Sequence, residues 1–103
     1  MIRYTTPTIT LEVDADLSSS DIYVSLVQGS KEKVVKNPSS SVSSGKTTLT
    51  FTFTQEESAS FNEYESIYLQ VNWITAGGTR NATEIATFNS FRNLLDEVIA
   101  YGN

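Results

Sequence analysis

The stretch Ser66-Ile-Tyr-Leu-Gln-Val-Asn-Trp-Ile-Thr75 alternates apolar and polar side chains over most of its length. A strand built from it would carry Ile67, Leu69, Val71 and Trp73 on one face, and Tyr68, Gln70, Asn72 and Ile74 on the other. A period of two is the pattern of a strand with one buried face, whereas a helix repeats its apolar positions about every three to four residues. The stretch therefore predicts the longest strand of a mostly β protein, with Trp73 in the core.

Similar alternation recurs along the chain and predicts further short strands, over residues 9–13, 22–26, 33–36, 47–54 and 81–88. The dipeptide Gly29-Ser30 predicts a two-residue hairpin loop, which would set Val24 opposite Val35. Five of the ten residues 37–46 are serine, and the others include one proline and one glycine. Because such a composition brings no apolar area, it predicts an exposed, mobile loop that folding does not need.

The turn at Gly77-Gly78 has two readings. If those two glycines were the whole loop, Glu84 would lie opposite Val71 on the core face, which would bury a carboxylate among apolar neighbours. A three-residue loop with a bulge would pair Ala76 with Arg80 instead. That register sets Ile85 against Val71 and turns Glu84 outward, and it is the one we predict.

Two segments have helical signals. Thr54-Gln-Glu-Glu57 has the spacing of a capping box and predicts one helical turn. At about residues 90–102 the apolar period changes from two to that of a helix. The stripe of this predicted C-terminal helix is too apolar to stay exposed. We therefore expect the helix either to pack against one end of its own domain's core or to dock on a partner protein. Its residues are the candidate partner-binding set: Phe91, Leu94, Leu95, Val98 and Tyr101.

Together these elements predict an immunoglobulin-like two-sheet antiparallel sandwich of about six to seven short strands, with a short crossing helical turn and a C-terminal helix. Residues 1–103 are expected to form a single domain, because a chain of 103 residues can bury a sizeable core.

Composition excludes several classes of function. The net charge of −5 and the pI near 4.5 oppose a nucleic-acid partner, which needs clustered Lys and Arg. The chain has no cysteine and no histidine, so disulfides, thiolate zinc sites and His-based triads are ruled out. Neither a signal-peptide run nor a stretch of about 20 apolar residues is present, so we expect no membrane partner and a cytosolic protein, at least until assembly.

Clustered acids are the candidate chemical groups. Asp14, Asp16 and Asp21 could bind calcium, but the further ligands and the closing Glu of a calcium loop are missing, so we expect solvated turn residues and no metal. Glu56, Glu57, Glu63 and Glu65 could supply a pair of catalytic carboxylates. Helix capping explains them better, and we expect no enzyme and no cofactor.

Aromatic residues suggest an alternative. Trp73, Tyr68 and Tyr23 could form a platform for sugar, as in a small carbohydrate or cell-surface binding β-sandwich module. Trp73, in line with Leu69 and Val71, is however expected in the core, and the two tyrosines on the polar faces of their strands.

Several short stretches carry a resemblance to a known family. They are Thr6-Pro7-Thr8, the run from Leu49 to Phe53 into Thr54-Gln55-Glu56-Glu57, Ile67-Tyr68-Leu69-Gln70-Val71, the glycine turn after Thr75, Glu84-Ile85-Ala86-Thr87 and Leu95-Asp96-Glu97-Val98. The chain resembles small proteins encoded in the tail modules of phages and prophages of Gram-positive hosts, and is similar to the immunoglobulin-like N-terminal domain of phage baseplate upper proteins.

The resemblance implies a non-enzymatic structural or assembly component of a phage tail or baseplate, acting by protein–protein docking. Its implied partners are other virion or tail proteins, with self-association left open. The implied location is the bacterial cytoplasm during assembly, with the virion left open as a later one. No individual functional residue is implied.

Overall fold

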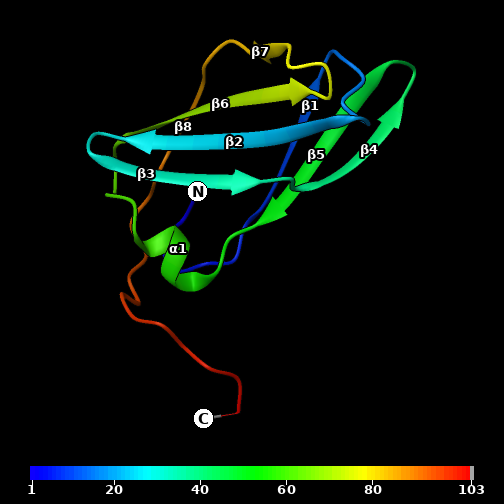
Figure 1. The fold of residues 1–103 in the computed structure, drawn as a ribbon. Coiled ribbons are helices and arrows are strands. Elements are labelled where there is room, and N and C mark those ends of the chain that lie inside the picture. Colours follow the sequence, from blue (N-terminus) through cyan, green and yellow to red (C-terminus); the bar gives the residue numbers. More distant parts are fainter. Residues whose placement is uncertain (103) are drawn as a thin grey trace.

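The structure, a computed structural model, describes residues 1–102 and is mostly β, with two antiparallel sheets and one short helix. Its elements are β1 (Thr8–Val13), β2 (Ser20–Gln28), β3 (Lys31–Lys36), β4 (Ser39–Ser43), β5 (Lys46–Thr52), α1 (Gln55–Ala59), β6 (Ser66–Thr75), β7 (Arg80–Ala82) and β8 (Ala86–Asn89). One sheet has the order β1-β5-β4. The other has the order β3-β2-β6-β7, and β8 also pairs with β6. In Figure 1 the strands of the smaller sheet run steeply across those of the larger one.

The two sheets pack against each other through one shared core. The alternation in β6 is confirmed, because Ile67, Leu69 and Val71 are buried. Trp73 is only half-buried and packs against the edge of the core. The core draws on four strands, β1, β2, β5 and β6, on the turn before β2 and on the segments around α1. Its buried residues are Val13, Leu17, Ile22, Val24, Leu26, Leu49, Phe51, Phe53, Phe61, Ile67, Leu69 and Val71.

The hairpin between β2 and β3 has the predicted register. Gln28 pairs with Lys31 around the loop Gly29-Ser30, and Val24 lies opposite Val35. Gly29 has φ +59, a left-handed conformation that a residue with a Cβ adopts at a cost. The two-residue loop therefore follows from its sequence, as predicted.

The prediction of a mobile loop at residues 37–46 is wrong, because Ser39–Ser43 forms β4 and pairs with β5. Its side chains are all exposed, as the composition predicts. The pairing uses backbone groups, which serine carries as well as any other residue. Asn37, at φ +49, turns the chain toward the smaller sheet, and its side-chain Oδ1 accepts a 2.8 Å hydrogen bond from the Ile22 N–H.

The loop after β6 has the predicted three residues but is shifted by one position. The Thr75 N–H donates to the Thr79 O at 2.9 Å, so Ala76, Gly77 and Gly78 form the loop. The predicted pairing of Ala76 with Arg80 is therefore wrong. Gly78 at φ +87 occupies the left-handed position that closes such a loop.

A bulge separates β7 from β8 and also changes the predicted register. Thr83, and not Ile85, lies opposite Val71: its N–H donates to the Val71 O at 2.9 Å and its hydroxyl accepts from the Val71 N–H at 3.1 Å. The hydroxyl replaces a backbone acceptor, which lets the strand bulge. Ile85 is consequently 61% exposed, whereas Glu84 is exposed as predicted.

The predicted C-terminal helix at about 90–102 is wrong, because this segment has no helix and runs past α1 away from both sheets (Figure 1). The carbonyls that would accept the first helical hydrogen bonds are already used. The Ser90 O accepts from the Tyr64 N–H at 2.5 Å, and the Phe91 O accepts from the Arg3 N–H at 2.9 Å. Beyond them the segment packs on no sheet face, and a short helix without packing is marginal in water. Within the described residues, no helix is long and apolar enough to span a membrane.

The capping box is confirmed at the start of α1. The Thr54 hydroxyl accepts from the Glu57 N–H at 3.1 Å, and the Glu57 carboxylate accepts from the Thr54 N–H at 2.9 Å. Beyond α1, Phe61 is buried and stacks on Phe53 with ring centroids 6.1 Å apart. α1 thus connects β5 in one sheet to β6 in the other.

Candidate docking surfaces

The predicted partner-binding residues lie on the C-terminal segment, which we define as residues 90–102. Leu94 is 90% exposed, and Tyr101 is exposed completely. Phe91, Leu95 and Val98 are each exposed by about half, at 45%, 50% and 48%. Without a helix they do not form a single stripe, but they are an apolar set that the rest of the described chain covers only in part.

The N-terminus holds the beginning of this segment in place. Ile2 and Phe91 form a parallel bridge, in which the Arg3 N–H donates to the Phe91 O at 2.9 Å. The Asn93 side chain adds a 3.0 Å hydrogen bond to the Arg3 O. The ring of Phe91 meets the ring of Tyr64 edge-on at 6.5 Å. The sequence reasoning missed this arrangement, because it places residues at opposite ends of the sequence side by side.

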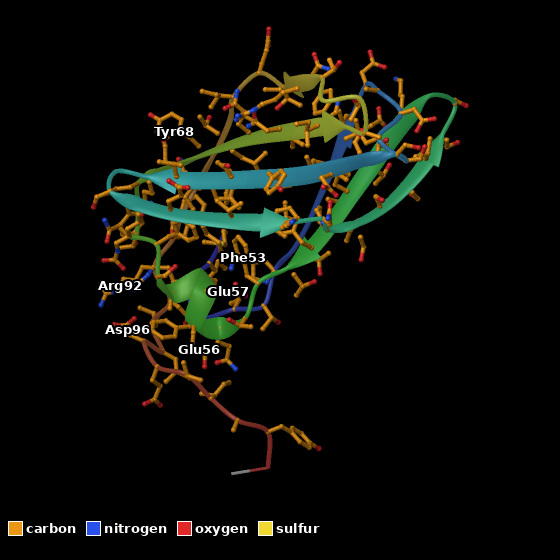
Figure 2. All side chains as sticks on the ribbon, in the orientation of Figure 1. Phe53, Glu56, Glu57, Tyr68, Arg92 and Asp96 are labelled. Carbon is orange, nitrogen blue, oxygen red and sulfur yellow. The ribbon has the colours of Figure 1, made fainter. Side chains whose placement is uncertain are left out.

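Two polar contacts hold the later part of the segment beside α1. The Arg3 guanidinium donates to the Ala59 O at 2.8 Å and lies 3.4 Å from the Asp96 carboxylate. Gln55 of α1 bonds to the backbone of Ile99 through both ends of its side-chain amide. Figure 2 shows Asp96 on the segment as it passes α1. Because these contacts use polar groups, the apolar side chains of the segment remain turned to solvent.

A second surface is the outer face of the five-stranded sheet, which no helix covers. Tyr68 is 49% exposed and projects away from the body of the molecule on the side opposite α1 (Figure 2). Two shallow pockets of about 410 and 300 Å³ share Ser25 and extend along this face. They are lined mainly by Tyr23, Val27, Val34, Tyr68, Gln70, Asn72, Ile74, Arg80 and Ile85.

The three aromatic residues of the predicted sugar platform are only partly brought together. Tyr23 and Tyr68 project from the same outer face, because each points opposite to the buried residues of its strand. Trp73 lies on the core-facing side of β6 and packs against the core. It contributes to the outer face only as one lining residue of the 410 Å³ pocket. Lys36 lies over the Tyr23 ring at 5.6 Å, which already occupies one of its faces.

A third surface is an apolar opening between the two sheets, at the side where β1 and β8 lie. Its volume is about 310 Å³. Ile9 and Leu11 of β1 and Phe88 of β8 face it and are only half-buried, although they pack against the core. The opening is lined by Met1, Pro7, Ile9, Thr10, Leu11, Leu69, Ala86 and Phe88. The sequence reasoning missed this opening, since strand alternation does not show where a sheet ends.

The aspartates do not converge: within residues 1–102, no three acidic side chains gather in a way that could hold an ion. Asp16 makes a local turn instead. Its carboxylate accepts from the Ser18 hydroxyl at 2.6 Å and from the Ser18 N–H at 2.9 Å. These two hydrogen bonds lower the pKa of Asp16, as expected when donors stabilise the charged form.

The four clustered glutamates do not share one site, and three of them make separate contacts with other residues. The ion pair with Lys33 and the Thr54 N–H together lower the pKa of Glu57. Glu63 lies 4.0 Å from the Arg3 guanidinium, and Glu65 accepts from the Asn62 side chain at 3.3 Å. A general acid needs a raised pKa, so the lowered pKa of Glu57 opposes a role as general acid for this residue.

Exposed apolar side chains are therefore the feature that the three surfaces share. Surfaces of this kind bind other macromolecules more often than they carry out chemistry, because chemistry needs convergent polar groups. Comparison with protein-family models, with characterised proteins and with solved structures found no match for this chain.

Proposed function

We propose that the protein is a non-enzymatic structural or assembly component of a phage tail or baseplate, which acts by docking to other tail proteins through an immunoglobulin-like domain. The family resemblance of the sequence supplies the tail or baseplate context. The exposed apolar side chains of the C-terminal segment carry the docking role, because a monomeric protein in water rarely leaves so many of them uncovered.

The strand order supports the immunoglobulin-like part of the proposal. In that fold a sheet of strands B, E and D packs on a sheet of strands C′, C, F and G. The orders β1-β5-β4 and β3-β2-β6-β7 fit this scheme when β1 takes the place of strand B. The helix α1 then lies between strands E and F. Within the described residues, no strand takes the place of strand A beside β1.

The C-terminal segment supports docking more strongly than the outer sheet face. Leu94 is 90% exposed, and the contacts that fix the segment, from Arg3 and from Gln55, are polar. A partner that covered Leu94 and its neighbours would remove them from water at about 25 cal/mol per Å² of apolar area. Beyond the bridge at Phe91, the segment is thus presented by the domain without being packed into it.

A carbohydrate-binding role is the alternative, and one observation favours it. Tyr23 and Tyr68 share an open sheet face with polar side chains, as in a sugar site. Several of those polar groups are already used, however. The Gln70 amide donates to the Thr83 O at 2.9 Å, and the side-chain Oδ1 of Asn72 accepts from the Arg80 guanidinium at 3.2 Å. The face therefore offers few free donors for sugar hydroxyls.

Two binding assays on the same purified protein separate the alternatives. The first measures its binding to a set of purified phage tail and baseplate proteins by calorimetry, and the second titrates it with bacterial cell-wall glycan fragments. We expect a specific complex with a tail protein and no heat with glycans. A protein that bound the glycans, lost that binding in the variants Tyr23→Ala and Tyr68→Ala, and bound no tail protein would overturn the proposal.

A further inference from the structure

We infer that two copies of this chain join through the free edge of β1, antiparallel about a two-fold axis, with Thr10 of each copy opposite Thr10 of the other. A strand at the edge of a sheet presents unpaired N–H and C=O groups, which pair readily with another strand. β1 is such a strand, because it pairs with β5 on one side only. The inference deepens the proposed docking function by naming one partner.

The other sheet edges carry more features that oppose pairing than β1, which has only the preceding Pro7 and one charged residue, Glu12. The edge of β3 carries Lys31, Lys33 and Lys36. The edge formed by β7 and β8 is interrupted by the bulge at Thr83. β4 has only hydroxyl side chains and one valine, all exposed, and follows directly on Pro38. Lysines, bulges and short polar strands are the usual means by which proteins keep an edge unpaired.

β1 has an uninterrupted register and little charge. All of its residues pair in sequence with β5, from Thr8 opposite Thr52 to Val13 opposite Thr47. Its one charged residue, Glu12, forms an ion pair with Lys46 of β5 at 3.5 Å. The strand contains no proline and no lysine. It is therefore a regular and nearly neutral edge.

The apolar opening beside β1 gives the pairing a second source of stability. Ile9 and Leu11 face the core and remain half-buried, because no further strand continues the sheet beyond them. Phe88 of the other sheet is half-buried at the same opening. A strand added to β1 would bring its own core-facing side chains over this opening. Main-chain pairing and apolar burial thus favour the same site.

A second copy of β1 fits this edge because an antiparallel pair can be symmetric. Directly opposite residues of such a pair point to the same face, so a two-fold axis can pass through a position where a residue meets its own copy. The opening meets β1 at Ile9, Thr10 and Leu11, whose centre is Thr10. An axis at Thr10 places Ile9 of one copy opposite Leu11 of the other, and Thr8 opposite Glu12.

The register with the axis at Thr10 also avoids repulsion. With the axis at Glu12, the two Glu12 carboxylates would face each other, and like charges directly opposite destabilise a strand pair. With the axis at Thr10, the threonines meet on the outer face and the apolar residues meet on the core face. Since so short a strand buries less than the roughly 1,200 Å² of a stable interface, we expect a dimer that exchanges with monomer.

Single cysteine variants test the register, because the chain has no cysteine of its own. Thr10→Cys places two thiols directly opposite, at a Cα separation of about 4.5–5.5 Å, which a disulfide can span. In Thr8→Cys the two thiols would lie four residues apart along the strands, at about 13 Å. Ser41→Cys on the exposed β4 controls for random collision.

Under mild oxidation, we expect Thr10→Cys to form disulfide-linked dimer at least tenfold faster than either control. Equal rates in all three variants, or no dimer from Thr10→Cys, would overturn the inference. Binding of a tail protein that persisted in that case would leave the proposed function standing. Conversely, if Thr10→Cys cross-linked as expected but the protein bound no tail protein, the strand pairing would be supported and the proposed function would be wrong.

Sedimentation equilibrium supplies an independent test without cysteine. We expect the mass of the wild-type protein to rise with concentration toward that of a dimer. Thr10→Lys would place two ammonium groups opposite each other and keep the protein monomeric, while Thr10 is exposed and its replacement leaves the core intact. Ser41→Lys adds the same charge to the same sheet and is expected to behave like wild type. A Thr10→Lys variant that dimerised as strongly as wild type would contradict the pairing.

Discussion

The side-chain amide of Gln55 exchanges two hydrogen bonds with the backbone of Ile99. Its Nε2 donates to the Ile99 O at 2.7 Å, and its Oε1 accepts from the Ile99 N–H at 2.8 Å. The amide thereby satisfies both backbone groups of Ile99, as a residue of a neighbouring strand would. It ties the far end of the C-terminal segment to α1 and so decides where the apolar residues between Asn93 and Ile99 are presented.

Replacing Gln55 with Ala should release the end of the segment and leave the domain folded. Hydrogen exchange should lose its protection at the Ile99 amide, while the melting temperature stays within a few degrees, because an exposed hydrogen bond contributes only about 1 kcal/mol. Glu56→Ala, at the exposed neighbouring position, is the matched control. Unchanged protection at Ile99 in the Gln55 variant would show that other contacts hold the segment.

Truncation should give different results at two sites. Removing residues 94–103 takes away exposed side chains, so the protein should stay cooperative and lose less than about 2 kcal/mol. Removing residues 90–103 also takes away the buried Ser90 and the bridge between Phe91 and Ile2. We expect a clearly lower melting temperature for the longer truncation. If the shorter one unfolded the domain, the segment would be part of the core and not a docking element.

Two buried serines form a matched pair for mutation. The Ser58 hydroxyl donates to the Thr5 O at 2.7 Å, whereas the Ser90 hydroxyl has no hydrogen-bond partner among the described residues. Both side chains are fully buried. Ser58→Ala should therefore cost about 1–2 kcal/mol in denaturant unfolding, and Ser90→Ala should be neutral or stabilising. A loss in Ser90→Ala as large as that in Ser58→Ala would mean that its hydroxyl has a partner.

The contribution of Glu57 to stability should depend on pH. Its pKa is lowered in the folded state, first by Lys33 and then by the Thr54 N–H, from a value of 4.5. A lowered pKa means that the stabilisation is present above about pH 4.5 and is lost as pH falls through the folded-state pKa. Glu57→Gln should thus cost about 1 kcal/mol at pH 7, because it weakens a cap and a partly exposed ion pair.

As pH falls from 4.5 through the lowered folded-state pKa, the stabilities of wild type and Glu57→Gln should converge, since below that pKa the carboxyl is protonated in both states. Urea unfolding at several pH values measures this difference. Glu56→Gln is the control, because the Glu56 side chain makes no hydrogen bond in the part of the chain that the structure describes. A difference that stayed constant from pH 7 to pH 3 would show that the carboxylate charge of Glu57 contributes nothing.

Local patterns predicted most of the strands, because they depend on neighbouring residues alone. The alternation from Ile67 to Val71, the Gly29-Ser30 turn and the cap at Thr54 all appear as expected. A further local signal was available and was missed. Ser44-Gly45, both at positive φ, forms the tight turn between β4 and β5.

The remaining features could not be read locally, because they depend on contacts between distant residues. The helical period at the C-terminus is real, but the backbone of Phe91 is already paired with Met1 and Arg3. Likewise, the bulge that exposes Ile85 depends on a hydrogen bond from Thr83 to Val71. Leu17 is buried in a turn region because the Thr47 hydroxyl, from another strand, accepts its N–H.

The affinity of a tail-protein complex for charged variants of the C-terminal segment tests the account most directly. Leu94→Glu combined with Val98→Glu places two carboxylates where the account puts the partner, while both sites are exposed and the fold should survive. Ser41→Glu adds a carboxylate on the exposed β4 as control. Calorimetry should show binding weakened at least tenfold in the double variant and unchanged in the control. Wild-type affinity in the double variant would contradict the claim that this segment is the docking surface.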